Sequence, residues 1–413
     1  MPYQGNRRSF NRTNTNRRPS QSFGGNRGGR PGGRSGGNRG RGPKKAYIHP
    51  SKFVREARPV KQEDYVATHQ FSDFPVADLL KQNLAKKGYV TPSPIQDQTI
   101  PEVLKGLDIV GIANTGTGKT AAFAIPTLNK LMSNQHSKVV IIAPTRELAQ
   151  QIEVECKDIA RGSGLTGAVL IGGSPMGPQL RDLRNNPRVV IGTPGRIKDH
   201  LERGTLKLNG FDTVVLDEVD RMLDMGFVQD VTDILSNVAE KRQSLFFSAT
   251  MDQRVMGIID KFANQPVTIS VKSGETSENV HQDIVAYQTH NDRITQLHDI
   301  LIDGKVEKVI IFDETQRGVE RLNEELLGRG FKTDSIHGGK TQGQRQRALA
   351  RFKKSEVSIL VATDVAARGI DVSGITHVIN YSTPGSYDDY IHRIGRAGRA
   401  GNVGYALTFV EAR

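Results

Sequence analysis

The chain has 413 residues, with 57 Lys and Arg against 44 Asp and Glu, so its formal net charge at pH 7 is +13. This length suffices for two or three domains with buried cores. The single cysteine, Cys156, excludes an intramolecular disulfide and a multi-cysteine metal site, and it predicts a reducing compartment. No apolar run approaches the roughly 18 residues of a membrane span, and the N-terminus has no apolar signal segment, so a cytoplasmic protein without membrane partners is expected.

The positive charge is concentrated in residues 1–45, which contain twelve Lys and Arg and no Asp or Glu. Because this segment also lacks Leu, Ile and Val, it cannot bury enough apolar surface to offset the entropy of ordering, and we expect a disordered basic tail. Arginines spaced by glycine favour salt-dependent contact with phosphates and unstacked bases. The same composition is also typical of a solubilising tail with no particular partner.

From Phe71 onward, short apolar runs alternate with amphipathic helical patterns, which predicts parallel sheets covered by helices on both faces. The polar stretch 272–280 predicts a linker, so we expect one α/β domain at 71–271, another at 281–413 and a ligand cleft between them. Residues 46–70 stay unassigned, as a linker or extension. Helices are expected at 76–88, 121–132, 146–162 (with Cys156 as a small buried residue) and 387–396, and strands at 109–112, 138–144, 167–173, 187–194, 212–218, 243–249, 266–271, 281–289, 308–314, 331–338, 358–364, 377–382 and 405–410.

The stretch from Asp108 to Thr120, DIVGIANTGTGKT, predicts a strand, a phosphate-binding loop and the start of a helix. A phosphate chain needs backbone N–H groups with no side chains in the way, and a helix N-terminus adds the positive end of its dipole. Lys119 would neutralise the β- and γ-phosphates, and the hydroxyl of Thr120 would bind Mg²⁺. The usual pattern begins with glycine where this chain has Ala113, and alone the stretch also fits an ordinary glycine-rich turn.

Two adjacent carboxylates, Asp217 and Glu218, close the apolar strand VVLDEVD. In a domain that already has a phosphate loop, this pair suits a metal ion and an attacking water. Asp217 would hold Mg²⁺, partly through water, while Glu218 would orient and deprotonate the nucleophile. An acidic helix N-cap after a strand is the alternative explanation for the acidic run.

With these motifs in this order, the chain from Phe71 to its last residues resembles the DEAD-box RNA helicases of superfamily 2. Phe71 and the stretch GYVTPSPIQ, ending at Gln96, resemble the adenine-binding Q motif, and ANTGTGKT matches the family's phosphate loop, which normally begins with alanine. Further segments resemble the family's RNA-contact, coupling and second-domain motifs: PTRELAQQ at 144–151, the glycine pair 172–173, TPGR at 193–196, SAT at 248–250, IIF at 310–312, Gln342 with Arg345, ATDVAARGID at 362–371 and HRIGRAGRAG at 392–401.

The resemblance implies two tandem RecA-like domains, each a mostly parallel sheet with helices on both faces, that use ATP and Mg²⁺. Arg396 and Arg399, three apart on the expected helix, would act as arginine fingers, which are worth about 10³ to 10⁵ in rate. Asp371 would reach the ribose and His392 the γ-phosphate side of the closed cleft. The resemblance implies that the catalytic residues are Glu218, Asp217, Lys119, Arg396, Arg399 and His392, and that the nucleotide is bound by Phe71, Gln96, Thr115, Gly116, Thr117, Gly118, Lys119, Thr120, Gly369 and Asp371. It implies that the metal ion is bound by Thr120 and Asp217, and that RNA is bound by Pro144, Thr145, Arg146, Gly173, Thr193, Pro194, Arg196, Arg345 and Thr363. The residues that it implies for coupling hydrolysis to strand separation are Asp220, Ser248 and Thr250.

The function that the resemblance implies is RNA-stimulated ATP hydrolysis coupled to local unwinding of short RNA duplexes or to remodelling of ribonucleoproteins. Backbone contacts carry no sequence information, so we expect little RNA sequence preference. A monomer with ribonucleoprotein or ribosome-assembly partners is expected. The alternatives are an ATP-dependent RNA clamp with little unwinding, a superfamily 2 DNA translocase, and an ATPase with no nucleic-acid partner. We also expect that deleting residues 1–45 raises the RNA concentration for half-stimulation and flattens its salt dependence.

Three positions depart from the family pattern. Val219 replaces the usual alanine of the carboxylate motif, but both metal-site carboxylates and Asp220 remain, so activity is expected. Gly339 follows His337-Gly338 where the family often has aspartate, which removes any contact by that side chain. The chain ends a dozen residues after its last motif, which predicts no C-terminal specificity domain and leaves targeting to the tail or to partners.

Overall fold

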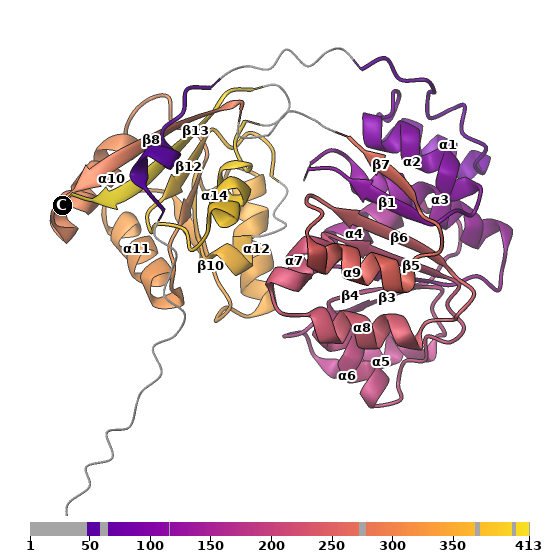
Figure 1. The fold of residues 1–413 in the computed structure, drawn as a ribbon. Helices are drawn as coiled ribbons and strands as arrows, with labels where there is room; N and C mark the ends of the chain where they lie inside the picture. Colours follow the sequence, from indigo (N-terminus) through magenta and orange to yellow (C-terminus); the bar gives the residue numbers. More distant parts are fainter. Residues whose placement is uncertain are drawn as a thin grey trace, which may run out of the picture. The chain divides into compact units, whose positions relative to one another are not determined.

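The computed structural model describes residues 48–57, 65–114, 116–271, 278–367, 372–398 and 402–412 (Figure 1). Contacts between residues divide the chain into residues 1–44 and a larger unit, Lys45–Arg413. The predicted basic tail and most of the predicted linker, 272–277, lie outside the described residues. None of the helices within the described ranges combines the length and apolar character that a bilayer crossing requires.

The first sheet has seven parallel strands in the order β3-β4-β2-β5-β6-β1-β7. Each forms where the sequence has a short apolar run, and the register sets Asp217 of β5 beside Phe247 of β6. The expectation of a parallel sheet in this part of the chain is therefore confirmed. The strands are β1 (Ile109–Ile112), β2 (Val139–Ile142), β3 (Gly167–Leu170), β4 (Val189–Gly192), β5 (Thr213–Asp217), β6 (Gln243–Ser248) and β7 (Val267–Ser270).

Helices cover both faces of this sheet because successive residues of each buried strand point to opposite sides. In β2, Val139 and Ile141 belong to the core under one set of helices, and Val140 and Ile142 to the core under the other. Buried residues of α1 to α4 share the first core, and those of α6 to α9 share the second. The helices are α1 (Asp78–Lys86), α2 (Pro94–Leu104), α3 (Lys119–Ser133), α4 (Arg146–Ile159), α5 (Met176–Arg184), α6 (Pro194–Glu202), α7 (Val219–Asp224), α8 (Val228–Asn237) and α9 (Gln253–Phe262).

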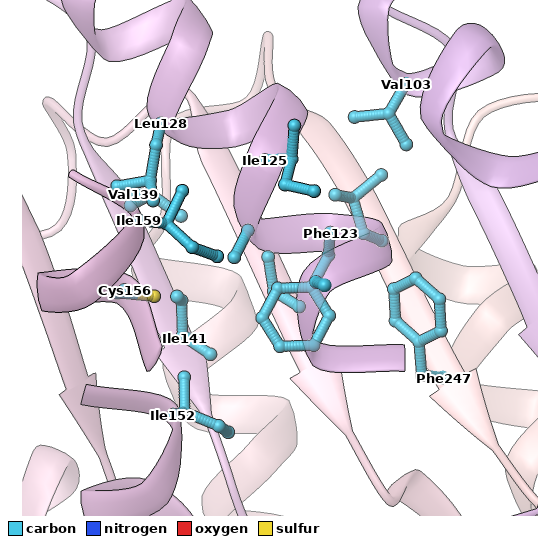
Figure 2. Packing of buried hydrophobic residues seen from close by; sticks show 14 of the residues in the cluster. Val103, Phe123, Ile125, Leu128, Val139, Ile141, Ile152, Cys156, Ile159 and Phe247 are labelled. Carbon is cyan, nitrogen blue, oxygen red and sulfur yellow. The ribbon is translucent and has the colours of Figure 1, made fainter. Parts of the chain in front are cut away.

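Figure 2 shows the first of these cores, where Phe123 of α3 lies near Phe247 of β6, with ring centroids 5.4 Å apart. The sulfur of Cys156 on α4 lies among the same apolar side chains. This residue is 5% exposed, and burial raises the pKa of its thiol to about 12. Its expected role as a small buried residue is confirmed.

The second sheet has six parallel strands in the order β10-β11-β9-β12-β13-β8. Its strands also divide their side chains between two cores: Ile310 of β9 lies in one and Ile311 in the other. The elements are β8 (Val280–Tyr287), α10 (His290–Leu301), β9 (Val309–Phe312), α11 (Gln316–Gly328), β10 (Thr333–Ile336), α12 (Gln342–Lys353), β11 (Ile359–Ala362), α13 (Asp364–Ala367), β12 (His377–Asn380), α14 (Tyr387–Ile394) and β13 (Gly404–Glu411).

A short stretch that the sequence left unassigned belongs to this second sheet. Residues 49–56 contain the 3₁₀ turn η1 (Pro50–Phe53), and Arg55 forms an antiparallel bridge with Gln282 of the edge strand β8. In Figure 1 this is the indigo segment beside β8. The chain thus contributes to its second sheet before it builds its first.

Candidate active site

The phosphate-binding loop lies between β1 and α3. Gly116 and Gly118 have φ angles of 85° and 92°, a region that favours glycine. Gly118 also has no room for a side chain, because an added Cβ would lie 2.3 Å from Nε2 of Gln96. Lys119 begins α3, is 6% exposed and donates from Nζ to the carbonyl of Ala113 at 2.8 Å. Thr115 lies outside the described residues.

Gln96 and Ser93, at the start of α2, hold this loop from the side. Gln96 Nε2 donates to the carbonyl of Gly118 at 3.0 Å, and its Oε1 accepts from the backbone N–H of Ser93 at 2.8 Å. Ser93 Oγ donates to the carbonyl of Thr117 at 2.7 Å, and Thr117 Oγ1 donates to the carbonyl of Asn114 at 2.8 Å. The Gln96 side chain therefore has a structural partner in the loop that binds phosphates.

Phe71 lies beside this region but inside the core. It is 3% exposed, and its ring packs edge-on against Tyr89, with centroids 5.1 Å apart, and against Phe74 at 5.9 Å. Tyr89, not singled out from the sequence although it is the aromatic residue of GYVTPSPIQ, lines the nearby cavity and donates its hydroxyl to Glu155 at 2.8 Å. The two predicted segments are therefore in contact through Phe71 and Tyr89, and the sequence pattern did not single out the second ring.

Asp97, the neighbour of Gln96, fastens the chain that leads into Phe71. Its carboxylate accepts hydrogen bonds from the Tyr65 hydroxyl at 2.6 Å, the Thr68 N–H at 2.7 Å and the His69 N–H at 3.2 Å. These hydrogen bonds hold the pKa of Asp97 below its usual value although burial acts in the opposite direction. Sequence reasoning missed this network, because nothing in the pattern separates Asp97 from an ordinary acidic residue in the first turn of a helix.

The two carboxylates at the end of β5 are buried side by side. Asp217 is 2% exposed, and burial raises its pKa to about 7; its Oδ1 has no hydrogen-bond partner among the described residues. Glu218 is 4% exposed and has a positive φ of 55°, which turns the chain sharply from β5 into α7. Burial would raise the pKa of Glu218 too, but Arg221, with Nε 3.4 Å from the carboxylate, and Lys119 hold it below its usual value.

Lys119, Asp217 and Glu218 line one cavity of about 550 Å³. Arg396 also lines it, and the charge of Arg396 favours ionisation of Glu218. The structure therefore brings together the predicted phosphate loop, the carboxylate pair and one of the two predicted arginines. The predicted site residues of the first domain that line the cavity are Gly116, Gly118, Lys119, Thr120, Asp217 and Glu218.

Asp220, in the first turn of α7, joins the carboxylate motif to the end of β6. Its Oδ2 accepts hydrogen bonds from the N–H groups of Ala249 and Thr250 at 3.1 and 3.0 Å, and from Thr250 Oγ1 at 3.2 Å. Its own N–H donates to Ser248 Oγ at 3.4 Å. The three predicted coupling residues, Asp220, Ser248 and Thr250, are thus in direct contact.

The predicted RNA-contact residues of the first domain follow β2, β3 and β4, which are neighbours in the sheet. Thr145 accepts from the Leu148 N–H at 3.2 Å and so caps α4, which begins at Arg146 after the buried Pro144. The guanidinium of Arg146 lies against Gly172 and Gly173, where an added Cβ on Gly173 would be 2.2 Å from its Nη1. The glycine pair thus provides space for this arginine.

Thr193, Pro194 and Arg196 lie at the start of the neighbouring α6. Thr193 is the N-cap, Pro194 occupies the first turn, and Arg196 Nη1 donates to the carbonyl of Ser174 at 3.5 Å. Since the carboxyl ends of parallel strands lie at one edge of a sheet, Thr145, Arg146, Gly173 and these three residues occupy one end of the first sheet. Two of their side chains, those of Arg146 and Arg196, carry positive charge there.

In the second domain, α14 ends earlier than expected. It runs from Tyr387 to Ile394, and Arg396 lies in the turn that follows, so the expectation of a helix through residue 396 is wrong. Gly395 and Gly398 explain the early end, since glycine is a poor helix former and Gly398 has a φ of 67°. Arg399, Gly369 and Asp371 lie outside the described residues. Burial lowers the pKa of His392 to about 4, with Arg221 contributing, so its imidazole is neutral at pH 7.

Arg393, which sequence reasoning missed, is the most completely bonded arginine near the site. It is 3% exposed and makes a two-pronged contact with Asp364, Nε to Oδ1 at 2.5 Å and Nη2 to Oδ2 at 2.7 Å. Its Nη1 donates to Asn380 Oδ1 at 3.1 Å, and its guanidinium lies 5.0 Å from the Phe312 ring centroid. Arg393 lies within the motif HRIGR, and its partner Asp364 lies within the motif ATDVAARGID. These two positions are the sequence signal that could have identified the pair.

The last two predicted RNA contacts are on the second domain as well. Arg345, on α12, is 6% exposed and forms an ion pair with Glu147, with Nη2 2.7 Å from Oε2. Gln342 on the same helix donates to Gln150 Oε1 at 2.9 Å. Thr363 follows β11, and its carbonyl accepts the N–H groups of Ala366 and Ala367 at 3.1 and 2.9 Å.

Comparison with known proteins assigns the family. A model of the DEAD/DEAH box helicases matches residues 93–258, and a model of the helicase conserved C-terminal domain matches residues 292–401. The DEAD-box ATP-dependent RNA helicase CshA of Bacillus subtilis (strain 168) is 43% identical over 350 residues, which span 84% of this chain and 70% of that protein. CshA of Bacillus cereus is 44% identical over 347 residues, which span 83% of this chain and 66% of that protein.

Solved structures give the same assignment. Dbp5 of S. cerevisiae, bound to RNA and ADP BeF3, is 27% identical with a TM-score of 0.72, over 83% of this chain and 90% of that one. Mss116p bound to ssRNA and AMP-PNP is 30% identical with a TM-score of 0.73, over 81% of this chain and 73% of that one. The two sheets are therefore RecA-like domains, and the chain belongs to the DEAD-box family of ATP-dependent RNA helicases.

Proposed function

We propose that this protein uses ATP hydrolysis to open short RNA duplexes locally and to remodel ribonucleoproteins. One observation carries the proposal: Lys119, Asp217 and Glu218 line a single cavity together with Gly116 and Gly118 of the phosphate-binding loop. A cation, a metal-binding carboxylate and a general base are the three groups that hydrolysis of a nucleoside triphosphate requires of a protein.

Glu218 is suited to act as the base. Arg221 and Lys119 keep its carboxylate ionised despite burial, so it can accept a proton from a water that attacks the γ-phosphate. Lys119 would neutralise phosphate charge, and Arg396, which lines the same cavity, would stabilise the charge that develops in the transition state. His392, neutral at pH 7, would serve as a hydrogen-bonding group.

The chain also fits Mg²⁺ at this site. Asp217 presents a buried carboxylate oxygen without a hydrogen-bond partner among the described residues, and Thr120 brings a hydroxyl to the same cavity. Hard divalent cations prefer such oxygen ligands. When bound, Mg²⁺ would neutralise phosphate charge, while Gln96 and Ser93 keep the loop in place.

Single-stranded RNA is the partner that suits best the part of the same carboxyl edge formed by β3, β4 and β2. Arg146 and Arg196 offer charge for phosphates, and the helix starts at Thr145 and Thr193 offer hydrogen-bonding groups beside them. None of these groups needs to contact a base edge, so we expect little sequence preference. Arg345 and Thr363 would extend the track onto the second domain, and the Asp220 contacts with Ser248 and Thr250 would couple it to the carboxylates.

Several broader features belong to the same proposal. The main parts of the domains would extend over 71–271 and 281–413, with residues 49–56 added to the second. The protein would act in the cytoplasm as a monomer, with the basic tail raising the local RNA concentration. Ribosome-assembly and other ribonucleoprotein complexes are the expected partners. The single cysteine and the absence of long apolar runs from the sequence support an intracellular setting.

The test is steady-state ATP hydrolysis without nucleic acid, with single-stranded RNA and with DNA of the same sequence. We expect stimulation by RNA only, and a loss of about 10² to 10⁴ in kcat for Glu218→Gln, because a positioned base contributes about that much. Glu240→Gln, which changes an exposed glutamate, is the matched control and should equal the wild type. Equal stimulation by DNA would favour a translocase, and RNA binding without turnover would favour a clamp.

A further inference from the structure

Residues 49–56, here called the strap, pack on the second domain although they precede the first. Phe53 is fully buried, with 0% exposure, and its side chain joins the core that contains Val280, Ile310 and Tyr390. Its ring centroid lies 4.8 Å from that of Tyr390. A fully buried aromatic ring within a 3₁₀ turn of four residues means that this turn is held by packing rather than by its own hydrogen bonds.

The strap is also bonded to the sheet. Arg55 N–H donates to the carbonyl of Gln282 at 2.9 Å, and Gln282 N–H donates to the carbonyl of Arg55 at 2.8 Å. Gln282 lies on β8, which is at the edge of the sheet, so the strap covers backbone groups that an edge strand otherwise exposes. Arg55 also pairs with Glu278 at 3.4 Å, and Lys52 Nζ lies 5.5 Å from the Tyr387 ring centroid.

These contacts converge on α14. Tyr390 is fully buried, with one side of its environment formed by Phe53, and its hydroxyl donates to Gln282 Oε1 at 2.9 Å. The same helix carries His392 and Arg393, and Arg396 lies two residues beyond its end. The strap and β8 together therefore hold the helix that precedes Arg396, the arginine that lines the nucleotide cavity.

We propose that the strap is a functional part of the second domain and that Phe53 is a positioning residue for Arg396. The inference rests on the proposed role of Arg396 in hydrolysis. Removing the Phe53 ring leaves space beside Tyr390, which lets α14 shift and moves the arginine relative to the phosphates. Because an arginine finger is worth about 10³ to 10⁵ in rate, even partial misplacement gives a large effect.

The test compares full-length Phe53→Ala with the wild type in RNA-stimulated ATP hydrolysis. We expect kcat to fall about 10-fold or more while KM for ATP changes less than about 2-fold, because the nucleotide-binding groups Lys119 and Gln96 belong to the first domain. Val54→Ala is the matched control, since Val54 is the next residue and 51% exposed; it should equal the wild type. Phe53→Leu, which keeps part of the apolar bulk, should have a kcat between those of Phe53→Ala and the wild type.

A merely structural role for Phe53 predicts a different result. It would lower the melting temperature while kcat, measured well below that temperature, stayed at the wild-type value, and that outcome would overturn the inference. If Phe53→Ala does not fold, Phe53→Leu is tested in its place. We then expect a kcat clearly below that of the wild type, and a wild-type kcat would contradict the inference. If the wild type shows no RNA-stimulated hydrolysis, the proposed function is overturned. If the wild type is stimulated by RNA and folded Phe53→Ala has the same kcat, only the role of the strap is overturned.

Discussion

At the scale of single residues, Asp217 and Glu218 differ in pKa although they are adjacent and equally buried. Burial raises the pKa of Asp217 to about 7, whereas Arg221 and Lys119 hold that of Glu218 below its usual value. A pair of titratable groups whose environments separate their pKa values can take separate chemical roles. Here the separation assigns the ionised base to Glu218 and leaves Asp217 as the carboxylate that a cation would stabilise.

Gly173 provides a test of the RNA contacts. Gly173→Ala would place a Cβ 2.2 Å from Arg146 Nη1, at a φ of 72° where a non-glycine residue costs about 1–2 kcal/mol. We expect the displaced Arg146 to raise the RNA concentration for half-maximal stimulation about 10-fold, since a hydrogen bond to a charged group is worth about 1.5–3 kcal/mol. ATP hydrolysis without RNA should be unchanged.

Gly177→Ala is the control for this variant, because nothing lies within 4 Å of an added Cβ on Gly177. It should need the same RNA concentration as the wild type. An unchanged RNA requirement in Gly173→Ala, with the protein folded, would remove Arg146 from the RNA-contact set.

Sequence patterns identified candidate site residues but few of their partners in the fold. The phosphate loop and the carboxylate pair were predictable because they depend on residue types at fixed local spacing. The hydrogen bonds from Gln96 to Gly118, from Tyr65 to Asp97 and from Arg393 to Asp364 join segments that only the fold brings together. Spacing within one segment carries no information about such partners.

At the scale of secondary-structure elements, Asp220 links the start of α7 to the end of β6. Asp220→Ala would remove the carboxylate that accepts from the N–H groups of half-buried Ala249 and exposed Thr250, and a hydrogen bond to a charged group is worth about 1.5–3 kcal/mol. We expect urea denaturation to show a loss of about 3 kcal/mol in the free energy of unfolding. We also expect duplex opening per ATP hydrolysed to fall, because the carboxylate motif loses its connection to residues 248–250.

Asp224→Ala is the matched substitution on the same helix. Asp224 is exposed and pairs with Arg254 at 2.8 Å, and exposed ion pairs are worth less than about 1 kcal/mol. If Asp220→Ala and Asp224→Ala lowered stability and duplex opening equally, the Asp220 contacts would have no special role in coupling.

Elements with an apolar periodicity were predicted correctly, and elements defined by nonlocal packing were not. Most strands form at an apolar run, because burial on both faces of a parallel sheet requires one, whereas the edge strands β10 (TDSI) and β8 (VHQDIVAY) also contain polar residues. The strap has a single buried residue, Phe53, whose partners lie on β8 and α14 far along the chain, so no local period identified it. The end of α14 at Ile394 was not predicted, because the three-residue spacing of Arg396 and Arg399 indicates a helical pattern although Gly395 and Gly398 favour an earlier end.

At the scale of the whole molecule, the order of the chain differs from the order of its domains. The strap joins the second sheet, residues 65–271 then build the first, and β8 returns to the second beside the strap. The second domain is therefore discontinuous in sequence. A division of the chain at residue 71 would separate Phe53 from the core in which it is buried.

The most direct test of the central claim is displacement of a labelled strand from a short RNA duplex. We expect release by the wild type with ATP, and none without nucleotide or by Glu218→Gln under multiple-turnover conditions. The same assay with a DNA duplex should show no release. ATP-dependent binding to RNA without strand release by the wild type would contradict the account and identify an RNA clamp instead.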